Sequence, residues 1–151
     1  MSDEHTTDPT DALAAARARR AELREANERA RAEQELKDLA AIEDLEILHG
    51  VANIATVRVN FSPGLPALVA VRCPEPPEMK RYHDTIKPSK KGDIGDPLAA
   101  AGQLGRACLV YPERDDPMRD ALFTQRPGVD TDLGNEAHKL VAIKAEDEGK
   151  G

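Results

Sequence analysis

From Asp11 to Leu48 the chain contains no proline and no glycine, and alanine, glutamate, arginine and leucine dominate. This composition predicts a single long helix, with Thr10 or Asp11 as its N-cap and Gly50 as the residue that follows its C-terminal end. At about 1.5 Å per residue, a continuous helix over this range would measure about 57 Å, which exceeds the width of a small domain. Part of the helix is therefore expected to project into solvent.

The two halves of this helix differ in apolar content. The first half, residues 14–32, carries only Leu23 among alanines and charges, so it lacks the repeated apolar positions of a self-sufficient coiled coil. The second half has large aliphatic residues at intervals of three: Leu36, Leu39, Ile42, Leu45 and Leu48. We expect the second half to pack on a domain. Two interpretations of the first half stay open: a solvated helix that frays, and a handle that becomes ordered on a partner helix.

After Gly50 the spacing of the apolar residues changes from helical to alternating. Ala55, Val57, Val59 and Phe61 alternate with polar residues, and a second run places Val69, Val71 and Cys73 on one face. Because residues 62–66 between the runs are rich in proline and glycine, the pattern predicts a β-hairpin. A two-stranded ribbon is marginal alone in water, so its apolar face must lie on helices, or its edge must be completed by another chain.

Short helices are expected after the hairpin. Pro77 suits the first turn of one, and the pairs Asp96-Pro97 and Asp116-Pro117 each combine a cap with a first-turn proline. The helix that begins at Asp96-Pro97 is expected to end near Tyr111. Asp130 or Thr131 can cap the last helix. Residues 87–95, which are rich in helix breakers, are expected to form a mobile loop.

These elements predict an α+β fold: a long N-terminal helix, a β-hairpin, and three or four short helices that form one small domain. Residues 1–10 are expected to be a disordered tail, residues 11–50 the long charged helix, residues 51–145 the α+β domain, and residues 146–151 a second disordered tail. The core is expected to contain Val57, Val59, Val69, Val71, Leu104 and Leu140.

The charge of the chain limits its partners. A formal net charge of −7 favours solubility and repels the phosphate backbone, so a nucleic-acid partner is disfavoured. No apolar run approaches the roughly 20 residues of a membrane span, and the acidic N-terminus does not resemble a secretory signal. We therefore expect an intracellular protein without a membrane partner, in which Cys73 and Cys108 are reduced thiols.

No cluster of residues predicts catalysis, a metal or a cofactor. The histidines at positions 5, 49, 83 and 138 lack the short ligand spacing of a zinc site. Cys108, His138 and an acid could form a nucleophilic trio only if the fold gathered them, and Cys108 falls on the apolar stripe of its expected helix. A structural thiol is the favoured interpretation.

The candidate contact residues for a partner are apolar or basic. A local basic patch of Lys80, Arg81, Lys87, Lys90 and Lys91 interrupts the acidic chain, and it could be a solvated loop, a surface for an acidic protein, or a phosphate site. The other exposed candidates lie on the first half of the long helix. The residues expected to contact a partner are Leu13, Leu23, Lys80, Arg81, Lys90 and Lys91.

Several short blocks resemble the bacteriophage tail assembly chaperones. The blocks begin with Leu48-His49-Gly50 and continue through residues 57–59, 68–74, 78–84, 107–112, 126–128 and 133–137. The resemblance extends from Leu45 to Val141, about two thirds of the chain. Residues 11–32 and 87–95 do not match the family's pattern.

The resemblance implies a non-enzymatic protein in the cytoplasm of an infected bacterial host. Its partners would be the tape measure protein, held soluble while tail tube subunits polymerise around it, and possibly the tail tube protein. Such chaperones have no catalytic residue, so the resemblance assigns none to this chain. The alternative is a structural or adaptor component of a virion or related particle that docks through its long helix. Pairing of the long helix with a second copy stays open, so a homo-oligomer is possible.

Overall fold

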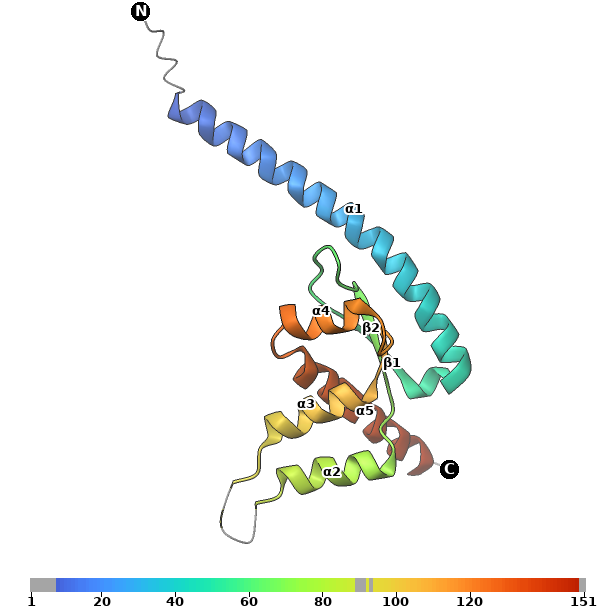
Figure 1. The fold of residues 1–151 in the computed structure, drawn as a ribbon. Helices are drawn as coiled ribbons and strands as arrows, with labels where there is room; N and C mark the ends of the chain where they lie inside the picture. Colours follow the sequence, from blue (N-terminus) through green and yellow to red (C-terminus); the bar gives the residue numbers. More distant parts are fainter. Residues whose placement is uncertain (1–7, 89–91, 93, 150–151) are drawn as a thin grey trace, which may run out of the picture.

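A computed structural model of the protein describes residues 8–88, 92 and 94–149. Figure 1 shows a long helix that extends past a small body in which helices surround a sheet. In chain order the elements are α1 (Pro9–His49), a 3-10 helix (Val51–Asn53), β1 (Ile54–Arg58), β2 (Leu68–Arg72), α2 (Pro76–Ile86), α3 (Pro97–Cys108), β3 (Leu109–Tyr111), α4 (Pro117–Gln125) and α5 (Val129–Gly149). The expected α+β fold is confirmed.

Helix α1 runs for 41 residues without interruption. Its N-cap is Asp8, whose carboxylate accepts a hydrogen bond from the Thr10 amide at 3.0 Å, and not Thr10 or Asp11 as expected. The helix starts earlier because Pro9 is tolerated in the first turn, where its missing amide proton has no helical partner. Gly50 follows the last helical residue, as expected.

The helix boundaries elsewhere follow the proline signals. Asp96 and Asp116 each cap the helix that begins at the next proline, as expected, with their carboxylates accepting from the amides of Ala99 and Met118. Helix α5 differs from the expectation at both ends. It begins at Val129, and it continues to Gly149 where a polar tail was expected from Glu146.

The sheet has three antiparallel strands in the order β1-β2-β3. Strands β1 and β2 form the expected hairpin, with Val57 opposite Val69 and Ala55 opposite Val71. Strand β3, which pairs with β2 on the other side, was predicted as the end of a helix. Three residues are too few to show an alternating pattern, and only pairing with β2 defines them as a strand.

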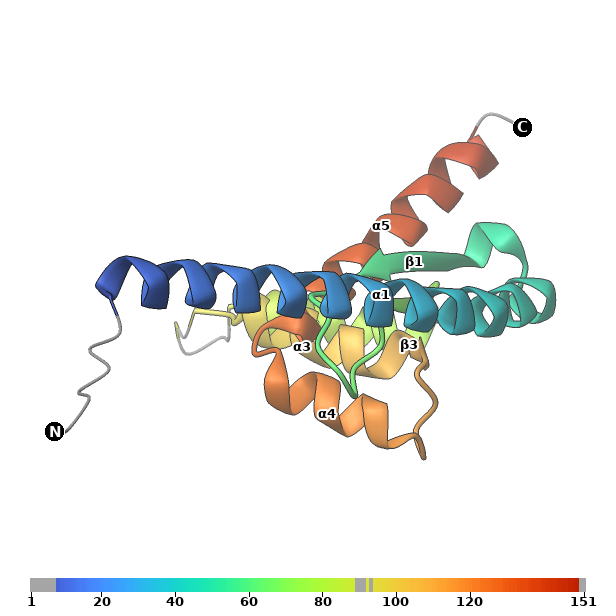
Figure 2. The same cartoon turned by 90° about the horizontal axis from the view of Figure 1, so that it is seen from above.

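The central strand β2 is buried on both faces. Val69 and Val71 pack against α3 and α5, whereas Leu68 and Ala70 pack against α1. Figure 2 shows α1 crossing the body on the side of the sheet opposite α3 and α5. Leu104 and Leu140 are also buried, as expected. Val57 and Val59 are only half-buried, since they belong to the edge strand and its extension.

The second half of α1 covers the sheet with a narrower face than expected. Ile42 is buried and Leu45 is half-buried, but Leu36, Leu39 and Leu48 are exposed. A step of three residues turns by about 300°, so side chains repeated at intervals of three spread over about 240° of the helix surface. One face cannot bury them all.

Helices α3 and α5 cross at close range because both carry glycine at the contact. A methyl group on Gly105 would overlap the carbonyl oxygen of Asp130, and one on Gly134 would overlap the carbonyl oxygen of Ala101. Neither backbone can move without separating the helices. This crossing completes the layer that covers the Val69 and Val71 face of the sheet.

Replacing Gly105 by alanine is expected to lower the free energy of unfolding by about 3 kcal/mol, because the added methyl group meets backbone atoms. The matched control is Gly102→Ala on the same helix, where the nearest atom is the movable Asp130 carboxylate at 3.1 Å. That variant should be near neutral, since alanine favours the helix by about 1 kcal/mol over glycine. Urea titration measures both. Equal losses would contradict the close crossing.

Candidate functional site

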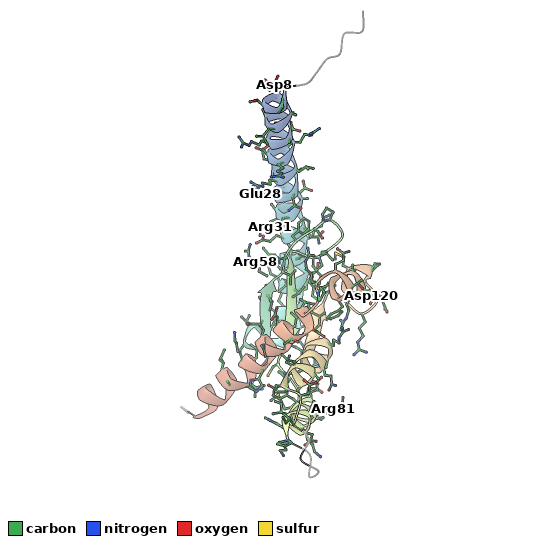
Figure 3. All side chains as sticks on the ribbon, turned by 90° about the vertical axis from the view of Figure 1, so that its left-hand side faces the viewer. Asp8, Glu28, Arg31, Arg58, Arg81 and Asp120 are labelled. Atoms are coloured by element: carbon green, nitrogen blue, oxygen red, sulfur yellow. The ribbon has the colours of Figure 1, made fainter. Side chains whose placement is uncertain are left out.

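The first part of α1 extends beyond the body with its side chains in solvent (Figure 1). From Pro9 to Arg29 every side chain is exposed except that of Ala16, which is half-buried. We call residues 9–29 the arm. At about 1.5 Å per residue it is about 31 Å long. Figure 3 shows Asp8 at its tip, with Glu28 and Arg31 near the point where α1 meets the body.

The joint between arm and body begins with an ion-pair bridge. Glu35 lies 3.8 Å from the Arg31 guanidinium one turn earlier and 3.4 Å from the guanidinium of Arg58 on β1. The Arg58 side chain is mostly exposed, so the bridge contributes at most about 1 kcal/mol. It orients the helix on the edge strand without anchoring it.

The anchor is Asp38, a fully buried carboxylate on the face of α1 that covers the sheet. One carboxylate oxygen accepts hydrogen bonds from the amides of Ala67 and Leu68 at 2.7 and 3.0 Å. The other accepts from the Gln34 side-chain amide at 2.9 Å and from the hydroxyl of Tyr111 on β3. Asp38 therefore ties α1 to both β2 and β3.

This anchor was not predicted from the sequence. A lone aspartate among exposed charges carries no signal of burial. The signal that could have found it is positional: Asp38 lies seven residues before Leu45 and four before Ile42, on the side of the helix that these two residues define. Burial of the Tyr111 hydroxyl and its hydrogen bond to Asp38 raise the pKa of Tyr111 well above its ordinary value.

The residues predicted to contact a partner do not form one site. Leu13 and Leu23 lie on the arm and are 51% and 70% exposed, about 80° apart around the helix axis. Lys80 and Arg81 are exposed on α2, and Figure 3 shows Arg81 at the opposite end of the molecule from the arm.

The remaining two predicted contact residues, Lys90 and Lys91, lie outside the described residues. So do residues 1–7, which make up most of the predicted N-terminal tail, and four positions of the predicted mobile loop. The described part of the basic patch is therefore confined to α2 and the residue that follows it.

A row of arginines on the arm was not among the predicted contacts. Arg17, Arg20 and Arg24 are spaced by three and four residues, which places them on one side of the helix. All three are exposed. We call them the arginine row. The spacing of three and four residues is visible in the sequence, and it brings like charges next to one another along the helix.

The body has a small hollow between α2 and α3. It measures about 270 Å³ and is lined by Glu78, Arg81, Tyr82, Ala100, Gln103, Leu104 and Ala107. Glu78 is already engaged, since its carboxylate holds the Arg72 guanidinium through two hydrogen bonds of 2.7 and 2.8 Å. This bond to Arg72 lowers the pKa of Glu78. Small-molecule sites usually exceed about 300 Å³, so the hollow is a weaker candidate than the arm.

The residues that could have formed a nucleophilic site lie elsewhere. Cys108 is fully buried in the core, and burial raises the pKa of its thiol to about 12. Two further hollows lie at the end of β1 and beside the 3-10 helix, and neither Cys108 nor His138 lines any of the three. A raised pKa keeps the thiol protonated, which is the reverse of what a nucleophile requires.

Within the described ranges, no three His, Cys, Asp or Glu side chains are grouped to hold a metal ion. None of the described helices combines the length and apolar character needed to cross a membrane. The chain matches no protein-family model, and neither a curated protein nor a solved structure shows significant similarity to it. Function has to be inferred from the arm and its joint with the body.

Replacing the buried Asp38 by asparagine is expected to lower the free energy of unfolding by about 2 to 4 kcal/mol, because an amide cannot accept all four hydrogen bonds. The same change at Asp44, an exposed position on the same helix, serves as the control and should have little effect. Chemical denaturation measures both. A tolerated Asp38→Asn variant would contradict the anchor.

Stability should fall at alkaline pH. Because the Cys108 thiol has a pKa of about 12 when folded and an ordinary value of 9.0, the folded state keeps its proton after the unfolded chain has lost it. The contribution of the Cys108 thiol to the free energy of unfolding is complete below pH 9. It declines by about 1.4 kcal/mol per pH unit as the pH rises toward 12.

Comparing Cys108→Ala with Leu104→Ala checks this pH dependence, since both change buried residues of one core cluster. Urea titrations from pH 8 to 12 should show a shallower decline for Cys108→Ala and the wild-type slope for Leu104→Ala. Equal slopes in all three proteins would exclude the buried thiol as the source.

Proposed function

We propose that this chain is a non-enzymatic bacteriophage tail assembly chaperone, which binds the tape measure protein and supports tail tube assembly in the cytoplasm of the infected host. The observation that carries the proposal is the arm, an exposed helix fixed to a folded body by a buried carboxylate. The resemblance of residues 45–141 to that family supports it. The blocks that carry the resemblance lie in the body, in and around β1, β2, α2, β3 and α5.

The surface of α1 suits a long helical client. Besides Leu13 and Leu23 on the arm, large apolar side chains are exposed where α1 crosses the body: Leu36, Leu39, Ile47 and Leu48. An amphipathic client helix can bury its apolar stripe against such side chains. The net charge of −7 would keep the complexes apart in solution while the client is held.

The second candidate is a structural or adaptor component of a virion. The same anchored helix favours it, because a rigid projection can dock permanently into a neighbouring subunit. Mass spectrometry of purified mature particles separates the two functions. A structural component would be present in stoichiometric amount, whereas a chaperone would be absent.

Co-expression tests the chaperone function directly. We expect the tape measure protein of the same phage to be soluble with the wild-type chain and insoluble without it. Replacing Leu13 and Leu23 by glutamate should reduce the recovered complex roughly tenfold or more, since charges would replace the apolar contacts. The unfolding midpoint should not change, because both side chains are exposed on the arm.

Leu98→Glu is the matched control for the arm variant, since Leu98 on α3 is 70% exposed, as is Leu23. It should leave the complex intact. An insoluble tape measure protein in the presence of the wild-type chain would refute the proposed function. If the Leu98→Glu variant lost as much of the complex as the arm variant, the binding surface would not be specific to the arm.

A further inference from the structure

The arginine row places three positive charges close together in an otherwise acidic chain. Arg17, Arg20 and Arg24 are exposed on one side of the arm, and Leu13 continues the same line toward the tip. The five cations of residues 9–29 are all arginines and none is lysine. Arginine presents a planar fork of donors that matches the two oxygens of a carboxylate, which a lysine ammonium does not.

The row is not neutralised within the described part of the chain. No carboxylate there lies within ion-pair distance of the three guanidinium groups. Arg20 has Arg17 three residues before it and Arg24 four residues after it, so like charges meet along the helix and destabilise it. A partner that brings negative charge would relieve this repulsion.

The arm has four carboxylates. Glu28, four residues after Arg24, lies beside the row at its body end, and Glu25 lies about 100° from the row around the helix axis. Asp11 and Glu22 are eleven residues apart, which places both on the side of the helix roughly opposite the row. A partner that lies along the row, and not around the whole arm, does not meet these two acids. The overall charge of −7 opposes binding of a polyanion such as a duplex or an anionic membrane.

The row faces the same way as the surface of α1 that covers the sheet. Arg24, Arg31 and Asp38 follow at intervals of seven residues, and Asp38 is buried against β2. The row therefore continues the line along which α1 contacts the body. Figure 1 shows that α1 extends past the point where the body ends. A segment bound there would extend this packing under the arm.

From these observations we infer that the arginine row is a docking surface for an acidic amphipathic helix of a partner protein. Carboxylates spaced by three and four residues would pair with the guanidinium groups, and an apolar side chain would contact Leu13. The inference deepens the proposed function, because it names the chemistry of the client segment and rests on the arm as the docking element.

The test uses the full-length protein and a fluorescently labelled synthetic helix with glutamates flanking a leucine stripe. Arg20→Glu with Arg24→Glu reverses two charges of the row. Arg19→Glu with Arg29→Glu makes the same change on the same arm, away from the row, and is the matched control. Circular dichroism of both variants checks that the helix content is unchanged.

We expect fluorescence anisotropy to show a loss of affinity of at least about tenfold for the row variant and less than about threefold for the control. Added salt should weaken binding to the wild type. Equal affinities for the two variants would overturn the inference. So would row-dependent binding to duplex DNA or to phosphatidylserine vesicles that exceeds binding to the acidic helix, or a wild-type dimer that only the row variant dissociates.

The tape measure protein distinguishes this inference from the function proposed above. If the wild-type chain binds the acidic helix through the row but does not keep the tape measure protein soluble, the chaperone function fails and the docking surface stands. If the tape measure protein is held equally by wild type and row variant, the function stands and the row is not its docking surface.

Discussion

A single buried carboxylate joins the two parts of this protein. Asp38 receives hydrogen bonds from β2, from β3 and from its own helix, so removing it would leave donors from three elements without a partner. Apolar contact on this side of the sheet is small, because only Ile42 and Leu45 of the large aliphatic side chains of α1 are buried or half-buried there. The direction in which the arm leaves the body therefore depends on a polar contact that has a specific geometry.

The sheet explains why the joint takes this form. Strand β2 is central and covered on both faces, so α1 has to supply the second layer of the body as well as the projecting arm. Amides at the start of β2 would be buried without a partner if an apolar helix covered them. Asp38 accepts from the Ala67 and Leu68 amides at this point. The same helix, α1, therefore completes the body and forms the projecting arm.

Much of the fold was predictable because its signals are local. Local signals include the helix caps Asp96 and Asp116 and the glycine after α1. The alternating apolar positions of the two hairpin strands, such as Val57 in one and Val69 and Val71 in the other, are also visible in short stretches of sequence. Strand β3 and the Asp38 anchor were not predictable in this way, since each is defined by partners distant in sequence.

The candidate site was predictable only in part. The exposure of Leu13 and Leu23 follows from their alanine-rich surroundings. That no carboxylate of residues 8–88, 92 and 94–149 lies within ion-pair distance of Arg17, Arg20 or Arg24 can be seen only in the structure. Lys80 and Arg81, predicted from charge alone, lie on α2, and Figure 3 shows Arg81 at the opposite end of the molecule from the arm.

The arm makes almost no contribution to the packing of the body, and this separation affects how the protein can evolve. Side chains from Pro9 to Arg29 can be exchanged with little effect on the fold, provided that the helix persists. Recognition can then drift residue by residue as a binding partner changes, while selection for folding acts on the sheet and its covering helices.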